Sequence, residues 1–226
     1  MAPTYIGDRA FYNCSKLDNN DIDLSAATYI GHQAMKNTKI SGVLNLAECL
    51  ELGENPFQGC KGITEIHAPK LTTMNMYSGW NDFTNLEVLD LPVTTRINYV
   101  QNNPKLTTIN APLATNFSTY DSDRCCFTNC PLLSTLNINF SAVTKFGGWC
   151  FDRDTGLNGQ YLDFPNVTLM ESEALRSNGI NFIFRNSSVI TLTGYGWFNN
   201  YTGTIYVPDN LVVTYKSTSG WSDIAS

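Results

Sequence analysis

Short stretches with the pattern apolar–x–apolar recur along the whole chain, each after a turn rich in asparagine and glycine. Their central apolar residues lie 20 to 27 residues apart. These central residues are Ile22, Leu44, Ile66, Leu89, Ile109, Leu136, Leu162, Phe182 and Ile205. One such unit is too small to bury its own apolar edge, whereas stacked units bury a continuous core. The pattern therefore predicts a repeat solenoid.

The spacing and the pattern inside the units indicate repeats of the leucine-rich type, which are ~20–29 residues long. The order L-x-x-L-x-L occurs, with apolar replacements, at 86–91 and 133–138. We expect each unit to add one short strand to a single parallel β-sheet of about nine strands, ~4.8 Å apart. The segments between them are short and polar, so irregular turns and short helical turns should form the other face.

The domain organisation follows from the same units. Residues 1–202 are expected to form the solenoid, and residues 203–226 its last strand and a C-terminal cap of the same domain. The end repeat of a solenoid needs a cover with a polar outer face. Leu211, Val212, Tyr215 and Trp221 are expected to supply its inner side. The sequence starts almost directly in a repeat, so we expect either a piece of a longer protein or a module whose first units pack on something else.

Three segments share a more specific form: YIGDRAFYNCSKL at 5–17, YIGHQAM at 29–35 and GTIYVPDNLVVTYKSTSGWSDIAS at 203–226. They resemble the BspA-like leucine-rich repeats. The resemblance implies a solenoid that serves mostly as a binding scaffold, on the surface of gut or oral bacteria, in eukaryotic parasites or in phage-linked proteins. The long unit between Ile109 and Leu136 departs from the family pattern.

Composition narrows the range of partners. Charged residues make up 15% of the chain, and the formal net charge is −6. Nucleic acids and anionic membranes attract basic surfaces, so neither is an expected partner. No apolar run approaches the ~18 residues of a membrane-spanning helix, and the N-terminus lacks the form of a signal peptide. The resemblance, rather than this composition, implies an extracellular or cell-surface location, with a phage virion as the alternative.

The positions of the seven cysteines are explained better by the repeat than by a metal-binding or catalytic site. Three occupy one slot, three residues before an apolar residue: Cys14, Cys60 and Cys130. In other units that slot holds Asn37, Asn103 or Asp154. The slot predicts small interior side chains, so Cys14 is expected to be buried and reduced. A disulfide such as Cys125–Cys150 stays open as an alternative, whereas zinc would require paired Cys or His ligands.

Signatures of catalysis are missing from the sequence. There is no GxSxG, HExxH, P-loop or GxGxxG motif, and the only histidines are His32 and His67. The acidic turns 18–23 and 152–156 resemble calcium loops but lack the closing glutamate. We therefore expect no enzyme, no cofactor and no metal site, with calcium at these turns as an alternative.

Two surfaces are candidates for binding. The residue after each central apolar residue should point out of the sheet. Seven of these positions carry polar side chains: Asp23, Asn45, His67, Asp90, Asn110, Asn137 and Asp163. They form either a solvated, hydrogen-bonded ladder or a binding face. Aromatic residues in turns form the second surface, of which Tyr77, Trp80 and Tyr120 are expected to be exposed.

Together these features favour a non-enzymatic recognition or adhesion module. Its partner would be a protein or a glycan on a host or neighbouring cell. The alternative is a structural spacer or assembly element of a larger surface protein or phage tail.

Overall fold

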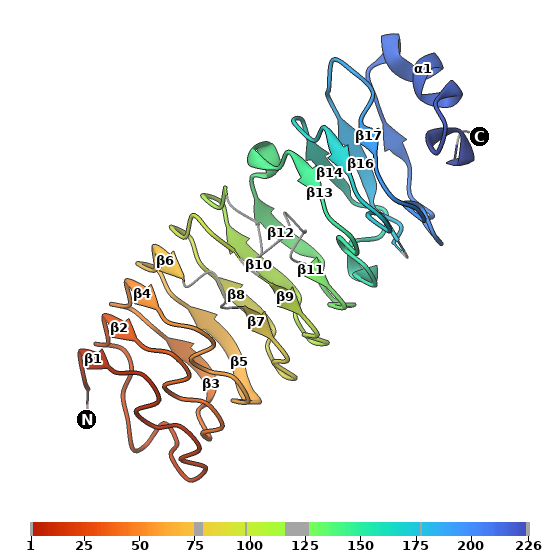
Figure 1. Ribbon diagram of the computed structural model, residues 1–226. Coiled ribbons are helices and arrows are strands. Elements are labelled where there is room, and N and C mark those ends of the chain that lie inside the picture. Colours follow the sequence, from red (N-terminus) through yellow and green to blue (C-terminus); the bar gives the residue numbers. More distant parts are fainter. Residues whose placement is uncertain (1, 75–78, 98, 116–126, 177, 225–226) are drawn as a thin grey trace.

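The computed structural model describes residues 2–74, 79–97, 99–115, 127–176 and 178–224. The chain winds into an elongated solenoid of stacked coils, with its N- and C-termini at opposite ends (Figure 1). All strand pairs in the described part of the chain are parallel. The predicted leucine-rich-repeat solenoid is confirmed.

The side that carries the predicted central residues is called face A. It holds a five-stranded sheet and a three-stranded sheet. The strands of the first are β3 (Ser41–Asn45), β5 (Gly62–His67), β8 (Val88–Asp90), β10 (Thr108–Ala111) and β12 (Thr135–Ile138). The strands of the second are β14 (Tyr161–Phe164), β16 (Asn181–Phe184) and β18 (Ile205–Tyr206). Central residues of neighbouring coils stand opposite one another, as Ile66 does with Leu89.

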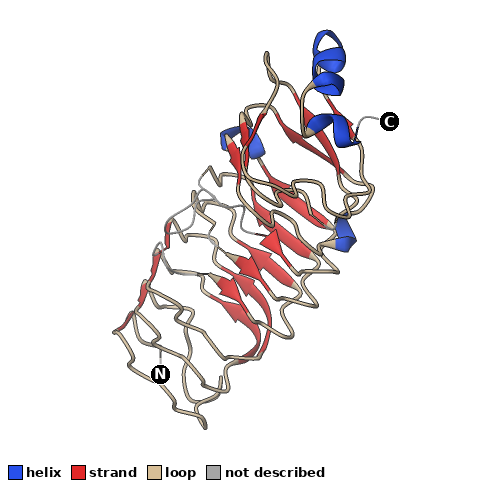
Figure 2. Ribbon diagram, turned by 45° about the vertical axis from the view of Figure 1, so that its right-hand side comes forward, coloured by secondary structure: helices blue, strands red, loops and turns tan. Residues whose placement is uncertain are grey.

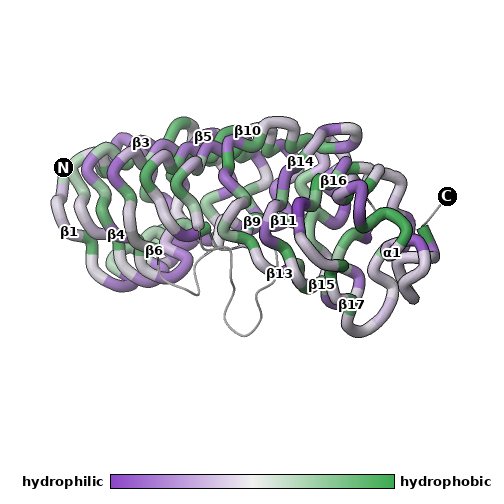
Figure 3. Tube along the Cα trace, turned by 90° about the horizontal axis from the view of Figure 1, so that it is seen from above, coloured by the Kyte–Doolittle hydropathy of each residue, from purple (hydrophilic) through white to green (hydrophobic). Residues whose placement is uncertain are grey.

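Two further series of two-residue strands complete the coils. Face B carries β1 (Tyr5–Ile6), β2 (Tyr29–Ile30), β4 (Glu51–Leu52), β6 (Thr73–Met74), β13 (Lys145–Phe146), β15 (Leu169–Met170) and β17 (Thr191–Leu192). Face C carries β7 (Trp80–Asn81), β9 (Val100–Gln101) and β11 (Phe127–Thr128). In Figure 3, where the stack runs from left to right, the strands of face B lie on the side opposite those of face A. Among the described residues, face C strands occur only in the middle coils, between β6 and β12.

The structure departs in two places from the single sheet of about nine strands that the sequence predicts. Ile22 is buried but lies in no strand, because Asp18 and Asp21 bind nearby backbone N–H groups and form a turn. The sheet of face A is also divided after β12, where the 3-10 helix η1 (Phe140–Ala142) begins at the capping residue Asn139. Local side-chain hydrogen bonds thus compete with strand pairing at both points.

Helical structure is concentrated at the C-terminal end (Figure 2). Apart from η1 and η2 (Thr155–Leu157), the helices follow β18 as η3 (Asp209–Leu211), α1 (Val212–Ser217) and η4 (Trp221–Ile224). Tyr215 and Trp221 are buried against each other, with ring centroids 4.8 Å apart. The hydroxyl of Tyr215 accepts the N–H of Ile190, and the indole N–H of Trp221 donates to the Ile190 carbonyl. These two side chains join the C-terminal segment to the last coils.

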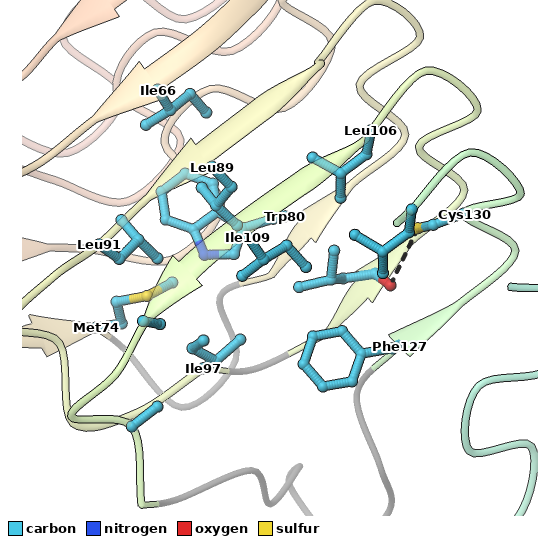
Figure 4. Close-up of a cluster of buried hydrophobic side chains, with 14 of the residues drawn as sticks. Ile66, Met74, Trp80, Leu89, Leu91, Ile97, Leu106, Ile109, Phe127 and Cys130 are labelled. Carbon is cyan, nitrogen blue, oxygen red and sulfur yellow. Dashed lines mark hydrogen bonds between the residues drawn. The ribbon is translucent and has the colours of Figure 1, made fainter. Parts of the chain in front are cut away.

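The interior changes character along the stack. Aliphatic side chains dominate the middle coils, where Ile66, Leu89 and Ile109 stack in successive strands (Figure 4). Phenylalanines fill the coils that follow: Phe127, Phe140, Phe146, Phe151, Phe164, Phe182 and Phe184. Their rings touch in stacked and edge-on pairs, such as Phe127 with Phe151 at 5.4 Å. Larger side chains thus occupy equivalent interior positions without breaking the stack.

Neighbouring coils approach closely at the glycines that follow the first strands of face B. A Cβ atom on Gly53 would lie 2.5 Å from the backbone nitrogen of His32, and one on Gly31 2.7 Å from that of Asp8. At Gly7, in the first coil, the nearest atom would be 3.7 Å away. Glycine is therefore required at this position only where a preceding coil lies beneath it.

The cysteine slot is confirmed at Cys60 and Cys130 but not at Cys14. Cys60 is buried, and its thiol contacts Met35 O at 3.1 Å and Thr38 Oγ1 at 3.3 Å. Thr38, rather than Asn37, therefore fills the slot in the preceding coil. Cys130 is buried likewise, 3.7 Å from the Val100 carbonyl (Figure 4).

Cys14 is free and exposed, so its expected burial is wrong. The slot is closed by the preceding coil, and the described chain contains no coil before that of Cys14. Cys150 is disulfide-bonded. Cys125 and Cys126 lie outside the described residues.

Asparagine and aspartate mark one corner of the coils. Asn13, Asn37, Asp82, Asn102 and Asn129 all have positive φ, between 56° and 62°. These residue types tolerate the left-handed conformation better than most. Their side chains also bind between coils: Asn37 Nδ2 donates to Asn13, Asn102 Nδ2 to Asp82 and Asn129 Nδ2 to Asn102. We call this set the corner row, and it accounts for part of the asparagine content.

Candidate functional site

Seven polar residues are predicted to point out of the sheet, each directly after a central apolar residue. Five of them lie side by side on the solvent side of face A. Asn45 stands opposite His67, His67 opposite Asp90, Asp90 opposite Asn110 and Asn110 opposite Asn137. The alternation of side chains along each strand places them outward, while the preceding central residues point into the core. The structure thus brings together residues that are up to 92 positions apart in the sequence (137 − 45).

Four of these residues are joined by side-chain hydrogen bonds into what we call the polar row. Asn137 Nδ2 donates to Asn110 Oδ1 at 2.6 Å, and Asn110 Nδ2 donates to Asp90 Oδ1 at 2.6 Å. The second oxygen of Asp90 lies 3.2 Å from His67 Nδ1. Each side chain is therefore held in one orientation by its neighbours in the adjacent strands.

His67 is held between two carboxylates. Its Nε2 lies 2.8 Å from Oε2 of Glu65, and its Nδ1 faces Asp90. A carboxylate can only accept, so the doubly protonated imidazolium, which donates from both nitrogens, fits this arrangement best. The hydrogen bond with Glu65, followed by that with Asp90, raises the pKa of His67 above its ordinary value. Glu65 is not among the candidate residues expected from the sequence, although its place two residues before His67 puts both side chains on one face.

Asp23 and Asp163, the other two of the seven predicted outward-facing polar residues, lie apart from the polar row. Asp23 belongs to no strand, and its carboxylate accepts the N–H of Ser25 at 2.9 Å. Asp163 lies in the three-stranded sheet and pairs with Arg185 through two contacts of 3.0 and 2.8 Å. The predicted series of outward-facing polar residues is therefore continuous only across the five-stranded sheet.

The aromatic residues expected in exposed turns give a different result. Trp80 is only 3% exposed, so its predicted exposure is wrong. It stands opposite Val100 in face C, and Val100 stands opposite Phe127, so Trp80 fills an interior position of its coil. Tyr77 and Tyr120 lie outside the described residues.

Other aromatic side chains are exposed instead. Tyr161 and Tyr206 lie on face A, with ring centroids 5.7 Å apart. Trp149 and Tyr195 lie in turns after the strands of face B. Trp149 is exposed and Trp80 is buried because they occupy different positions within their coils, which the sequence around each residue does not show.

The described residues contain neither a metal-binding cluster nor a membrane-spanning helix. No three His, Cys, Asp or Glu side chains there form a group suited to a metal ion. Nor does that part of the chain contain a helix with the length and apolar character needed to cross a membrane.

Comparison with known proteins identifies the repeat. A family model described as the BspA type leucine rich repeat region matches residues 2–104 and 98–205, with 6 copies. No curated protein matches the chain. The crystal structure of a leucine-rich repeat protein from Bacteroides ovatus is similar with a TM-score of 0.60 and 19% sequence identity. The similarity covers 91% of this chain but only 58% of that protein, and at this identity it shows the fold alone. The family match spans most of the sequence, and the chain therefore belongs to the BspA-type leucine-rich repeat family.

Proposed function

We propose that this protein is a non-enzymatic recognition module that binds a protein partner through the five-stranded sheet of face A. Repeats of this family generally form interaction and surface modules, which supports the class of function. The proposal places the module outside a bacterial cell. The disulfide at Cys150 supports this location, because disulfides persist mainly in oxidising compartments.

The polar row is the observation that carries the proposal. His67, Asp90 and Asn110 are half-buried and Asn137 is exposed, so the row is open to solvent yet fixed by its own hydrogen bonds. A surface that is already ordered loses little side-chain entropy when a partner binds. Four adjacent strands offer a span of ~14 Å in this row alone, at ~4.8 Å per strand.

Charge suggests what kind of partner fits. Glu65 and Asp90 flank His67, and the whole chain carries a formal net charge of −6. Complementary potentials favour a partner that presents basic groups to this face. When His67 loses its proton, the face becomes more negative, so binding of a basic partner should tighten as the pH rises through the pKa of His67.

The geometry of His67 also supports a role other than catalysis. A general base needs a free nitrogen within reach of a substrate proton. Both nitrogens of His67 are occupied by carboxylates of the protein itself. The row is therefore better suited to presenting a fixed pattern of donors and acceptors than to moving protons.

A binding screen tests the proposal. Purified host matrix proteins and bacterial surface proteins, chosen to span basic and acidic isoelectric points, would be immobilised and probed with the wild-type protein. The test variant is Asn110→Arg, which places a cation and a larger side chain at the centre of the polar row. The control is Val213→Arg, on the exposed side of α1 at the far end of the solenoid.

We expect at least one basic protein to bind wild type and Val213→Arg equally and to bind Asn110→Arg about tenfold more weakly or worse. Equal binding of all three would remove face A from the proposal. Failure of every protein to bind would favour the alternative of a structural spacer or assembly element in a surface or phage protein.

A further inference from the structure

A cleft of about 340 Å³ lies on the opposite side of the solenoid, over the turns that follow β13, β15 and β17. Three successive coils line it, and each contributes one residue at an equivalent position: Trp149, Glu173 and Tyr195. Trp149 N donates to Glu173 O at 3.1 Å, and Glu173 N donates to Tyr195 O at 3.0 Å. The backbones of Trp149 and Tyr195 are thus two coils apart, ~10 Å at ordinary strand spacing.

Both aromatic residues of the cleft are unusually exposed. Trp149 is 49% exposed and Tyr195 is 71% exposed. The indole N–H of Trp149 donates to the carboxylate of Glu173, which fixes the position of the ring. Rigid aromatic side chains with one polar end are typical of binding surfaces, because they offer a large contact area at a low entropic cost.

The charges of the cleft are already balanced. Glu171 forms an ion pair with Lys145 at 2.8 Å, and Glu173 forms one with Arg176 at 2.9 Å. Both pairs leave carboxylate oxygens that can still accept hydrogen bonds. A cationic or anionic ligand would therefore gain little from net charge, whereas a neutral ligand with hydroxyl groups could use the free acceptor positions.

Apart from the two aromatic residues and the two glutamates, the residues that line the cleft are small: Gly148, Ser172, Thr193 and Gly194. Gly194 has a positive φ of 86°, a backbone conformation that favours glycine, and a Cβ atom there would also overlap the Ser172 hydroxyl. The Ser172 hydroxyl accepts the N–H of Tyr195 at 3.1 Å. Its own proton can be donated to a ligand oxygen. The cleft thus combines two aromatic faces with hydroxyl and carboxylate groups between them.

We propose that this cleft binds a neutral saccharide, with a sugar ring stacked on Trp149 or Tyr195 and its hydroxyls donating to Glu171 and Glu173. A pyranose ring offers a C–H face to an aromatic ring and hydroxyl groups along its edge, which matches the two kinds of surface here. This site is separate from the polar row and goes beyond the protein recognition proposed for face A.

Ligand-observed saturation-transfer NMR tests the assignment. The probes are the methyl glycosides of glucose, galactose, mannose and N-acetylglucosamine and short neutral oligosaccharides of each, with choline and an oligolysine peptide as cationic probes. The variants are Trp149→Ala and Tyr195→Ala. The control is Tyr161→Ala, which removes an aromatic side chain of intermediate exposure, 62%, from face A. Thermal melting of each variant shows that the solenoid is intact.

We expect at least one neutral saccharide to bind wild type and Tyr161→Ala alike, with about tenfold weaker binding or none in the two cleft variants. Absence of saccharide binding, or binding that both cleft variants retain, would overturn the assignment. Binding of only the cationic probes, lost in the cleft variants, would assign the cleft to a cationic ligand instead. Asn110→Arg should bind the saccharide as wild type does, so this result and that for face A are independent.

Discussion

The Nε2 atom of His67 lies 2.8 Å from Oε2 of Glu65, two residues earlier on the same strand. This contact, more than the one with Asp90, raises the pKa of His67. A group whose pKa is raised in the folded state stabilises the fold fully below its unfolded pKa, and this contribution is lost as the pH rises through the folded pKa. The polar row should therefore be most stable under mildly acidic conditions.

Changing Glu65 to Gln should lower the pKa of His67, because the neutral amide no longer favours the charged imidazole. Asp90→Asn should lower it by less. The measurement is an NMR titration of the His67 ring in wild type and both variants. An unchanged pKa of His67 in Glu65→Gln would show that the contact does not control its protonation.

Asp154 occupies the interior slot in which Asn103 makes two hydrogen bonds. Asn103 accepts the N–H of Phe83 at 3.0 Å and donates to Trp80 O at 2.6 Å. Asp154 accepts the N–H of Cys130 at 2.6 Å, but its Oδ2 is buried without a partner. Burial is the main cause that raises the pKa of Asp154 to about 8.

The raised pKa of Asp154 predicts how stability depends on pH. The folded state keeps a proton that the unfolded chain releases above its ordinary pKa, so stability should fall as the pH rises toward 8. Asp154→Asn removes the titrating group and should stabilise the protein at pH 8 and above by about 1–3 kcal/mol. Urea unfolding of both proteins between pH 5 and pH 9, in roughly unit steps, measures the difference. A constant difference across this range would contradict a titrating Asp154.

The cysteines should differ sharply in reactivity. Cys14 is exposed, whereas burial raises the pKa of Cys49 to about 11 and that of Cys130 to about 12. Only the thiolate reacts with disulfide reagents, so native protein should label rapidly at Cys14 and slowly at the other two. Mass spectrometry of the labelled peptides assigns each rate, and Cys14→Ser identifies the fast component.

The same cysteines should differ in their effect on stability. Cys14→Ser changes an exposed side chain and should alter the free energy of unfolding by less than about 0.5 kcal/mol. Cys130→Ser places a hydroxyl in a fully buried slot and should cost about 1–3 kcal/mol. Equal effects of the two substitutions would show that the slot is open to water at Cys130.

Gly7 and Gly53 form a matched pair for testing how tightly the coils stack. Gly53→Ala would force its Cβ atom against the backbone of the preceding coil, and overpacking of this kind costs about 1–3 kcal/mol. Gly7→Ala meets only ordinary contacts and should change stability little. Chemical denaturation of the two variants gives both values. A similar loss in both would place the strain in the backbone conformation rather than in the stacking.

The central residues of face A could be read from the sequence because their spacing is regular and their neighbours are polar. Ile66, Leu89 and Ile109 fall in register as the pattern predicts. Face B was missed because its strands contain only two residues, as at Tyr5–Ile6 and Tyr29–Ile30. A strand of two residues carries too little alternation to give a period.

The candidate sites show the same limit. His67 and Asp90 could be placed on one surface because they follow regularly spaced anchors. Trp80 and Trp149 both directly follow a glycine in the sequence, yet one is buried and the other exposed. Their difference depends on the position of each within its coil, which local composition does not reveal.

The side-chain amides of the polar row all donate in one direction, from each coil to the coil before it. Asn137 donates to Asn110, and Asn110 donates to Asp90. The corner row follows the same rule, and its Asp82, like Asp90, receives bonds without needing to give one. A duplicated coil with asparagine at both positions could therefore enter either row without disturbing the pattern. Such a row lets the repeat array grow or shrink by whole units in evolution while its surface chemistry is preserved.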